Sequence, residues 1–371
     1  MIQHNFCANE NPSVSFAALP EATMPFGAGL LLLRFERPSV ILLAMAALKK
    51  ACFQWQRSGE VLSIQVAQNE VARLVRVLAE ALSVVEQGAI RVIWEVVGKA
   101  LSIGDCFDVQ TLREWLARAQ SGWFLAMMRD DKFEAHFQPI VNVQSPHAIY
   151  GYESLLRGVT EGGLVAPLPL FEVAGGLQLR AQLDAKARQQ AICQAGSLGV
   201  RERLFINCLP SALDDAQMAL SATLNIIDDA GLKREQIVLE IIESECIEDA
   251  DALRRGLELF RRAGIGIALD DLGAGYSSLT LLERLRPDFV KLDRELIGGV
   301  DTGGFKAVIA QKLLETARNL DIATVAEGVE TAGEWNWLRA HGGDLAQGYF
   351  FARPAAQPPL AAQWMNAVSL N

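Results

Sequence analysis

Apolar and polar positions alternate along the chain, but the pattern differs before and after residue 122. In the first part, three short apolar runs are typical of strands, and two longer stretches have the spacing of amphipathic helices. The strand-like runs cover residues 30–36, 61–67 and 89–97, and the helix-like stretches cover residues 40–56 and 69–87. A further helical stretch follows at residues 108–120. We therefore expect residues 1–122 to form a small N-terminal α/β domain.

The second part carries strand-like runs that are mostly separated by helix-like stretches. The runs cover residues 133–141, 148–156, 203–209, 237–244, 265–271, 288–293, 322–328 and 345–351. Eight strands alternating with helices are typical of a (β/α) barrel, so we expect residues 123–371 to form a modified (β/α)8 TIM-like barrel. The link between the first two runs is too short for a helical crossover, which predicts that these two strands are antiparallel.

Polar side chains stand at the ends of these runs or just after them. In a (β/α) barrel such positions converge at the C-terminal face, where catalytic groups lie. The residues concerned are Glu153, Asn207, Glu240, Asp270, Asp271, Lys291, Glu327 and Gln347.

These residue types favour one kind of chemistry. Carboxylate and amide oxygens without histidine or cysteine suit Mg²⁺, Mn²⁺ or Ca²⁺ rather than zinc. The adjacent Asp270 and Asp271 can bind two ions, and Lys291 would be a cation beside them that contacts an attacking water. Each residue alone also has an ordinary explanation: a turn for the aspartates, a helix cap for Asn207, solvation for Lys291. Their joint placement at successive strand ends favours the metal site.

Composition and charge exclude several other classes of protein. The 371 residues carry a formal net charge of −10, which does not favour a broad electrostatic grip on DNA or RNA. The most apolar stretch is interrupted by Arg34, Glu36, Arg37 and Pro38, so no membrane span is expected. The start has no basic region of a secretory signal, and the six cysteines form no CxxC pair. We expect reduced thiols and a cytoplasmic protein.

An ordered set of motifs between about residues 133 and 354 resembles the EAL domain, the cyclic di-GMP phosphodiesterase of bacterial signalling. The motifs are FQPIV, YESLLRG, LFINCLPSAL, VLEIIES, LDDLGAGYSSL, PDFVKLD, VAEGVET and QGYFFARP. The resemblance implies hydrolysis of cyclic di-GMP to linear pGpG with two Mg²⁺ or Mn²⁺ ions. It also implies a homodimer through the barrel.

The resemblance also implies a role for each matching residue. Glu153, Asn207, Glu240 and Asp270 would bind the first metal, and Asp270, Asp271 and Glu327 the second. The catalytic set would be Lys291, which contacts the nucleophilic water, with Glu327, Gln347 and Glu153. The substrate would be held by Gln138, Arg157 and Asp184, Glu243 would anchor the loop after the aspartates, and Glu330 would lie near the site.

Some positions depart from the family pattern without removing a metal ligand, namely Ser154, Gly158, Ile242, Leu272 and Ala274. We expect the last two to affect the loop after the aspartates rather than the chemistry. The N-terminal region matches no family, and by analogy it would sense a signal or bind a partner. Two alternatives stay open: a non-catalytic EAL-like receptor or protein-interaction module, and a different two-metal TIM-barrel hydrolase.

Overall fold

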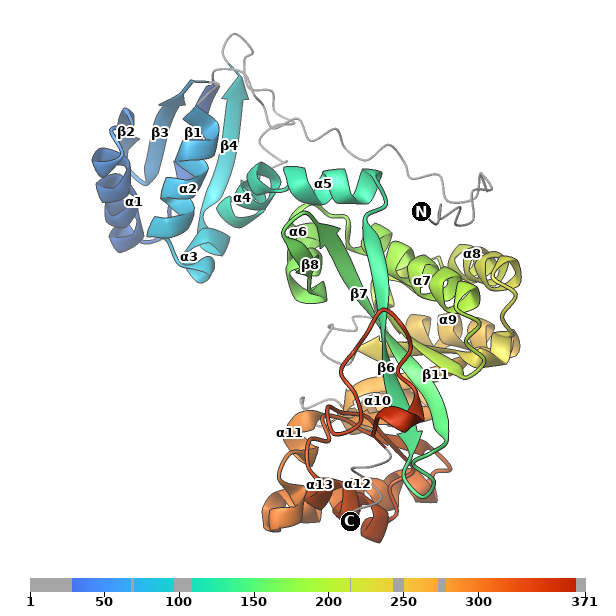
Figure 1. Ribbon diagram of the computed structural model, residues 1–371. Coiled ribbons are helices and arrows are strands. Elements are labelled where there is room, and N and C mark those ends of the chain that lie inside the picture. The colour runs from blue at the N-terminus through green and yellow to red at the C-terminus, as the bar shows by residue number, and fades with distance from the viewer. Residues whose placement is uncertain are drawn as a thin grey trace. The chain divides into compact units, whose positions relative to one another are not determined.

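A computed structural model describes residues 29–67, 70–96, 109–213, 215–242, 250–272 and 278–364. These residues form two compact units (Figure 1). The smaller unit contains residues 29–132 together with residues 168–180, and the larger unit contains residues 133–167 and 181–364. The short segment 168–180 therefore groups with the smaller unit, although it lies between strands of the larger one in the sequence.

The smaller unit is an antiparallel sheet with helices. Its strand order is β2-β3-β1-β4-β5, and every neighbouring pair is antiparallel. The strands are β1 (Gly29–Arg34), β2 (Trp55–Ser58), β3 (Val61–Val66), β4 (Arg91–Val96) and β5 (Gln110–Thr111). The helices are α1 (Pro38–Lys50), α2 (Val71–Ala81), α3 (Val84–Ala89), α4 (Leu112–Gln120), α5 (Gly122–Arg129) and α6 (Pro167–Gly176). Alternate residues of β1 and β3 pack with α1 and α2 in one apolar core.

Two of the expected helices in this unit are shorter than predicted. The helix predicted through Gln56 ends at Lys50, because Cys52 has a left-handed backbone (φ 58°) and Trp55 begins the edge strand β2. The helix predicted over residues 69–87 is broken after Ala81. There Ser83 accepts a hydrogen bond from the Glu86 N–H and starts α3 with a capping box. Cap and turn residues therefore override a continuous helical period.

The larger unit contains a closed barrel of eight strands. The strand order is β6-β14-β13-β12-β11-β10-β9-β7, and the additional pairing of β6 with β7 closes it. Strand β6 is antiparallel to both neighbours, while the other pairs are parallel. The predicted modified barrel and its antiparallel entry are confirmed. The strands are β6 (Phe133–Asn142), β7 (Ile149–Thr160), β9 (Arg203–Cys208), β10 (Ile237–Ile242), β11 (Gly266–Leu272), β12 (Phe289–Leu292), β13 (Ala323–Ala326) and β14 (Leu345–Ala346).

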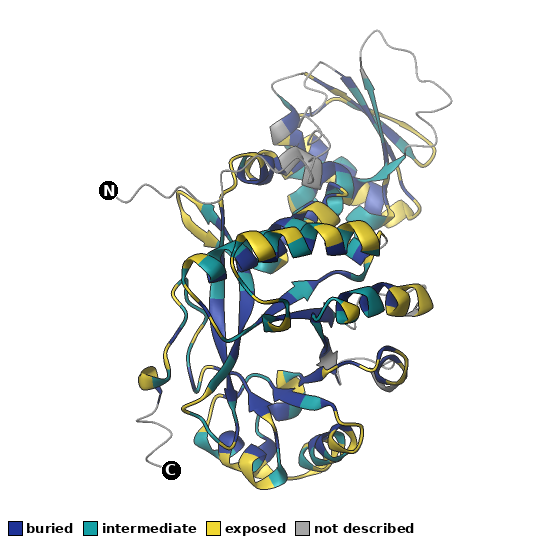
Figure 2. Ribbon diagram, turned by 90° about the vertical axis from the view of Figure 1, so that its right-hand side faces the viewer, coloured by how far each residue is buried: buried dark blue, intermediate teal, exposed yellow. Residues whose placement is uncertain are grey.

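Helices surround this barrel, with buried inner faces and exposed outer faces (Figure 2). They are α7 (Arg180–Ser197), α8 (Ala216–Asp229), α9 (Ala250–Arg262), α10 (Ser278–Leu285), α11 (Arg294–Ile297), α12 (Phe305–Asn319) and α13 (Ala332–His341). Single turns of 3-10 helix lie at Pro210–Leu213, Arg234–Gln236, Val300–Thr302 and Ala361–Gln363. A short strand, β8 (Gly163–Val165), extends β7 outside the closed barrel and was not expected from the sequence.

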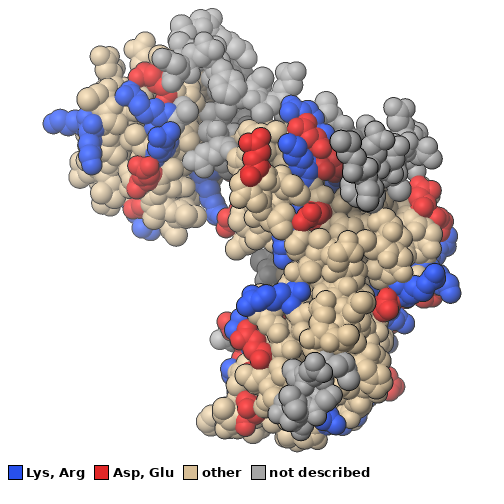
Figure 3. Space-filling model, viewed as in Figure 1, with Lys and Arg blue, Asp and Glu red and all other residues tan. Residues whose placement is uncertain are grey.

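The surface agrees with the charge and hydropathy of the sequence. On the face shown in Figure 3, acidic and basic side chains lie interspersed in small groups rather than in one basic area. Within the described ranges, every helix is too short or too polar to span a lipid bilayer. None of the three described cysteines forms a disulfide.

Inside the barrel, seven strands each contribute one residue to an apolar layer. Such layers fill small barrels because side chains on parallel strands point inward at every second position. The layer consists of Ile140, Phe205, Val238, Ala268, Phe289, Val325 and Leu345. The polar residues described below lie directly above this apolar layer, toward the carboxyl ends of the parallel strands.

Candidate active site

The residues predicted from the strand ends form the next layer of the barrel interior. On the strands β9 to β14 they stand two positions after the apolar layer, and on β7 Glu153 stands two positions after Gly151, so they face inward by the alternation of a strand. On the antiparallel β6, Gln138 stands two positions before Ile140 and pairs with Glu153 of β7. The described members of this layer are Gln138, Glu153, Asn207, Glu240, Asp270, Lys291, Glu327 and Gln347. The structure thus brings the described strand-end residues together, as predicted, and adds Gln138, which the resemblance alone had suggested.

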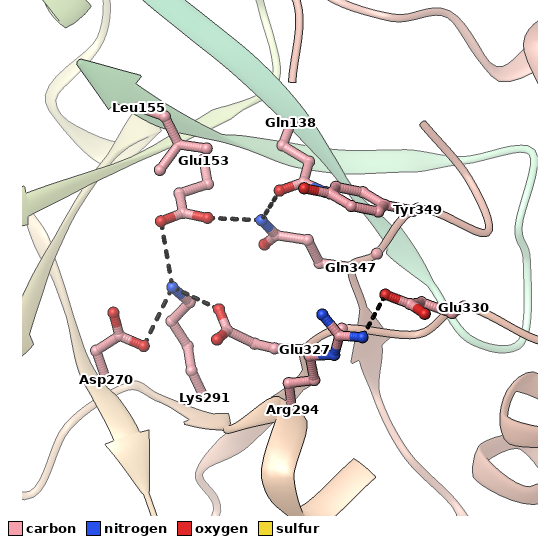
Figure 4. A pocket seen from close by; sticks show the side chains of 12 residues that line it. Gln138, Glu153, Leu155, Asp270, Lys291, Arg294, Glu327, Glu330, Gln347 and Tyr349 are labelled. Atoms are coloured by element: carbon pink, nitrogen blue, oxygen red, sulfur yellow. Dashed lines mark hydrogen bonds and ion pairs between the residues drawn. The ribbon is translucent and has the colours of Figure 1, made fainter. Parts of the chain in front are cut away.

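Lys291 lies at the centre of this layer, among four carboxylates, and Figure 4 shows three of them, Glu153, Asp270 and Glu327. Its Nζ is 2.7 Å from Oε1 of Glu327 and 2.9 Å from Oε1 of Glu240. It is 3.2 Å from Oδ1 of Asp270 and 3.6 Å from Oε1 of Glu153. Lys291 is 1% exposed and Glu240 is fully buried, so solvent screens these charges little.

Burial and mutual repulsion perturb the groups of this cluster. Burial raises the pKa of Glu327 to about 8, against the opposing effect of the Lys291 ammonium. Burial likewise raises the pKa of Glu240 well above its ordinary value. For Lys291, burial lowers the pKa, but the four carboxylates outweigh burial and raise it well above its ordinary value. One ammonium does not balance four carboxylates, so the cluster favours additional positive charge.

Amides hold the carboxylate of Glu153 in place. Gln347 donates from Nε2 to Oε2 of Glu153 at 2.6 Å and to Oε1 of Gln138 at 2.9 Å. Asn207 donates from Nδ2 to Oε1 of Glu153 at 3.3 Å. Gln138 in turn donates to the carbonyl of Ala352 at 3.3 Å. Two amides therefore hold the Glu153 carboxylate directly, that of Asn207 on β9 and that of Gln347 just after β14.

The donor set of the cluster suits a hard divalent cation. Glu240 is fully buried: its Oε1 pairs with the Lys291 ammonium at 2.9 Å, and its Oε2 has no hydrogen-bond partner, which is costly unless a cation compensates it. Among the described side chains, no three acidic, histidine or cysteine groups are arranged to hold an ion as they stand. The Lys291 ammonium lies between the carboxylates instead. The residues present thus fit a metal in chemistry and charge.

The adjacent aspartates stand at an irregularity of β11. Leu269 pairs with Val290 and Leu272 pairs with Leu292, so Asp270 and Asp271 together oppose Lys291. Such a bulge places two residues against one and interrupts the strict alternation of side chains. The side chain of Asp271 is outside the described part of the chain. Its predicted metal role therefore stays a prediction.

A cavity of about 270 Å³ opens over the cluster. It is lined by Gln138, Glu153, Leu155, Asp270, Lys291, Arg294, Glu327, Gly328, Glu330, Gln347, Gly348 and Tyr349. Sequence reasoning did not single out Arg294 and Tyr349. Both follow a site residue closely in the sequence, Arg294 by three positions and Tyr349 by two, and that spacing was the available signal. Arg294 pairs with Glu330 at 2.8 Å, and Arg353 stacks 4.1 Å from the ring centroid of Tyr349.

Two residues expected to bind substrate do not line this cavity. Asp184 is buried on α7, where its Oδ2 pairs with Arg188 at 3.1 Å and its Oδ1 accepts from the Leu209 N–H at 2.9 Å. These contacts tie α7 to the end of β9, just after Asn207. Arg157 follows Glu153 and Leu155 along the same face of β7 and donates to the Leu156 carbonyl at 2.9 Å. Glu243, the predicted loop anchor, lies outside the described residues.

Comparison with known proteins gives this geometry a family. The model of the EAL domain matches residues 114–354. The chain is 36% identical over 171 residues to the blue light- and temperature-regulated antirepressor BluF of Escherichia coli, covering 46% of this chain. It is 33% identical over 240 residues to the cyclic di-GMP phosphodiesterase NbdA of Pseudomonas aeruginosa, covering 63% of this chain. The chain spans 42% and 30% of the lengths of these two relatives.

A solved structure gives the same result at the level of the fold. The standalone versatile EAL protein of Vibrio cholerae, in its cyclic di-GMP-bound form, superposes with a TM-score of 0.56 at 33% identity. The similarity covers 62% of this chain and 94% of that protein. The matched region contains every residue of the cluster around Lys291. This chain belongs to the EAL domain family.

Proposed function

We propose that this protein hydrolyses one phosphodiester bond of cyclic di-GMP, giving linear pGpG, with two divalent ions, Mg²⁺ or Mn²⁺. The observation that carries the proposal is the buried cluster of four carboxylates around Lys291 at the end of an EAL barrel. NbdA is named for cyclic di-GMP and the Vibrio cholerae structure contains it, which supports this substrate. In the cell, this reaction would lower the concentration of the second messenger cyclic di-GMP.

Each residue would contribute a simple physical action. Glu153, Asn207, Glu240, Asp270, Asp271 and Glu327 would hold the ions, which supply a hydroxide nucleophile and stabilise the leaving oxygen when bound. Lys291 would keep its positive charge and donate to the attacking water or to a phosphoryl oxygen. Gln347 would fix the carboxylate of Glu153 through its 2.6 Å hydrogen bond. Gln138 would orient Gln347 and the nucleotide.

The test is incubation of the purified chain with cyclic di-GMP and either Mg²⁺, Mn²⁺ or EDTA, followed by chromatography for pGpG. We expect pGpG to accumulate with metal and not with EDTA. Glu153→Gln preserves the size of the side chain and should abolish turnover, whereas Glu315→Gln on the outer helix α12 is its control. Full turnover in EDTA, or no pGpG under any condition, would contradict the proposal.

A second function is favoured by one observation. The Lys291 ammonium already occupies the space between the carboxylates, an arrangement that is electrostatically satisfied in part without metal. BluF, an antirepressor by name, shows that a relative of this chain acts on a repressor. The alternative is therefore a non-catalytic receptor for cyclic di-GMP or a protein-interaction module. If the chain binds cyclic di-GMP in the presence of Mg²⁺ or Mn²⁺ but forms no pGpG, the receptor function is favoured. The homodimer, the partner of the N-terminal region and the cytoplasmic location stay predictions.

A further inference from the structure

The cavity contains one cation that the cluster around Lys291 does not use. Among the described residues that line it, the basic side chains are Lys291 and Arg294. Lys291 is buried against four carboxylates. Arg294 instead makes one ion pair, from Nη2 to Oε1 of Glu330, and its side chain is 64% exposed. Figure 4 shows its guanidinium between Glu327 and Glu330, on the side of Glu327 away from Lys291.

The fold makes room for this arginine. Arg294 begins α11, directly after the strand that carries Lys291, and its stem lies over Gly328. A Cβ on Gly328 would come within 2.5 Å of the Arg294 Cγ and within 2.6 Å of its Cβ. Gly328 also has a left-handed backbone (φ 65°), which an L side chain adopts with strain. A glycine next to Glu327 therefore lets the guanidinium reach the cavity.

The partner of Arg294 is held from behind. Glu330 follows Gly328 by two positions, and its N–H donates to Oε2 of Glu334 at 2.8 Å. The same carboxylate accepts from the Thr331 N–H at 3.0 Å, and its Oε1 accepts from the Gly299 N–H at 2.7 Å. Gly299 lies just beyond the end of α11, so Glu334 ties together the two segments that carry Arg294 and Glu330. The pair is therefore set on fixed backbone while its charged ends stay exposed.

We propose that Arg294 binds the second phosphate of the substrate, the one that is not cleaved, after exchanging its ion pair with Glu330 for the ligand. This inference rests on the proposed function. Cyclic di-GMP carries two phosphodiesters, and the cluster around Lys291 accounts for one of them. An exposed ion pair contributes little, so its exchange is favourable when a phosphate offers the guanidinium two oxygens at once. Arg294 is thus a specificity residue for cyclic dinucleotides over simple phosphodiesters.

The experiment compares two substrates that differ in their number of phosphates. Cyclic di-GMP has two phosphodiesters, and bis(p-nitrophenyl) phosphate has one. For Arg294→Ala we expect KM for cyclic di-GMP to rise about tenfold or more with kcat changed by less than about threefold. The kcat/KM for bis(p-nitrophenyl) phosphate should stay within about twofold of the wild-type value. Arg294→Lys keeps the positive charge but loses the planar guanidinium that can donate to two oxygens at once. Its KM for cyclic di-GMP should therefore lie between those of the wild type and Arg294→Ala.

Lys312→Ala is the matched control, because Lys312 and Glu315 form an exposed pair on α12 with side-chain exposures of 68% and 39%, against 64% and 39% for Arg294 and Glu330. The Lys312→Ala variant should have wild-type KM and kcat for cyclic di-GMP and a wild-type kcat/KM for bis(p-nitrophenyl) phosphate. Equal loss on both substrates, or an unchanged KM for cyclic di-GMP, overturns the assignment. If the wild type binds cyclic di-GMP without cleaving it, the proposed function fails. Titration calorimetry with cyclic di-GMP then tests the role of Arg294, since Arg294→Ala should still weaken binding of the nucleotide about tenfold. A wild type that neither binds nor cleaves overturns both.

Discussion

The two units of this chain use inward-facing strand positions for different purposes. In the smaller unit, inward positions such as Leu31, Leu33 and Ile64 are apolar and pack under α1 and α2. In the barrel, the inward positions are apolar in one layer and charged or amide-bearing in the next. The difference shows that charge can be buried where several strand ends supply partners to one another, whereas the described strand positions under α1 and α2 are filled by apolar side chains.

The largest effect should come from removing the charge at the centre of the barrel. Lys291→Ala leaves four carboxylates, three of them buried, without their ammonium, and we expect turnover to fall by about 10²–10³-fold or more. Breaking a buried ion pair also lowers the free energy of unfolding, here by about 3–5 kcal/mol in EDTA. Steady-state kinetics and chemical denaturation, with and without Mn²⁺, measure both quantities. If turnover stayed within tenfold of the wild type, the active site would not be the cluster around Lys291.

The second prediction compares the two units directly, with one substitution in each. Leu33 of β1 and Leu345 of β14 are both buried, and Leu345 lies two residues before Gln347. Each Leu→Ala substitution should lower the free energy of unfolding by about 2–5 kcal/mol. Only Leu345→Ala should also lower kcat, because only it lies in the layer beneath the site. Denaturation and kinetics on the folded fraction test this. An equal fall in kcat for both variants would show that the smaller unit supports the chemistry.

The sequence predicted the barrel and most of the site because both depend on one period. Side chains alternate between the two faces of a strand, which fixes the ones that point into the barrel. Because the parallel runs end at the same face, Glu240, Asp270 and Lys291 come together. The same reasoning could not find the bulge at Asp270, since a change of register between β11 and β12 depends on both strands. Nor could it distinguish Arg294, which reaches the cavity, from Asp184, which is paired inside the protein.

A smaller effect is expected at the edge of the site, where backbone conformation rather than charge is tested. Gly328→Ala places a Cβ against the stem of Arg294 and forces an L residue into a left-handed backbone. We expect a loss of about 1–3 kcal/mol in unfolding free energy. KM for cyclic di-GMP should also rise, because the guanidinium is displaced. Gly299→Ala is the control, with a similar φ of 74° and no neighbour within 4 Å of a Cβ. Equal KM values for the two variants would contradict the role of this contact.

The smallest effect concerns the support of the pair formed by Arg294 and Glu330. Burial alone would raise the pKa of Glu334, but the N–H groups of Gly299, Glu330 and Thr331 outweigh burial and lower it below the ordinary value of 4.5. A group whose pKa is lower in the folded state stabilises the protein above its unfolded pKa and ceases to do so as pH falls through the folded value. Glu334→Gln should therefore cost about 1 kcal/mol at pH 7, and the difference from the wild type should vanish as the pH falls below 4.5. Denaturation at several pH values measures it. A difference that is constant with pH would mean that Glu334 acts through its shape and not through its charge, in which case the anchoring of Glu330 would not depend on the carboxylate.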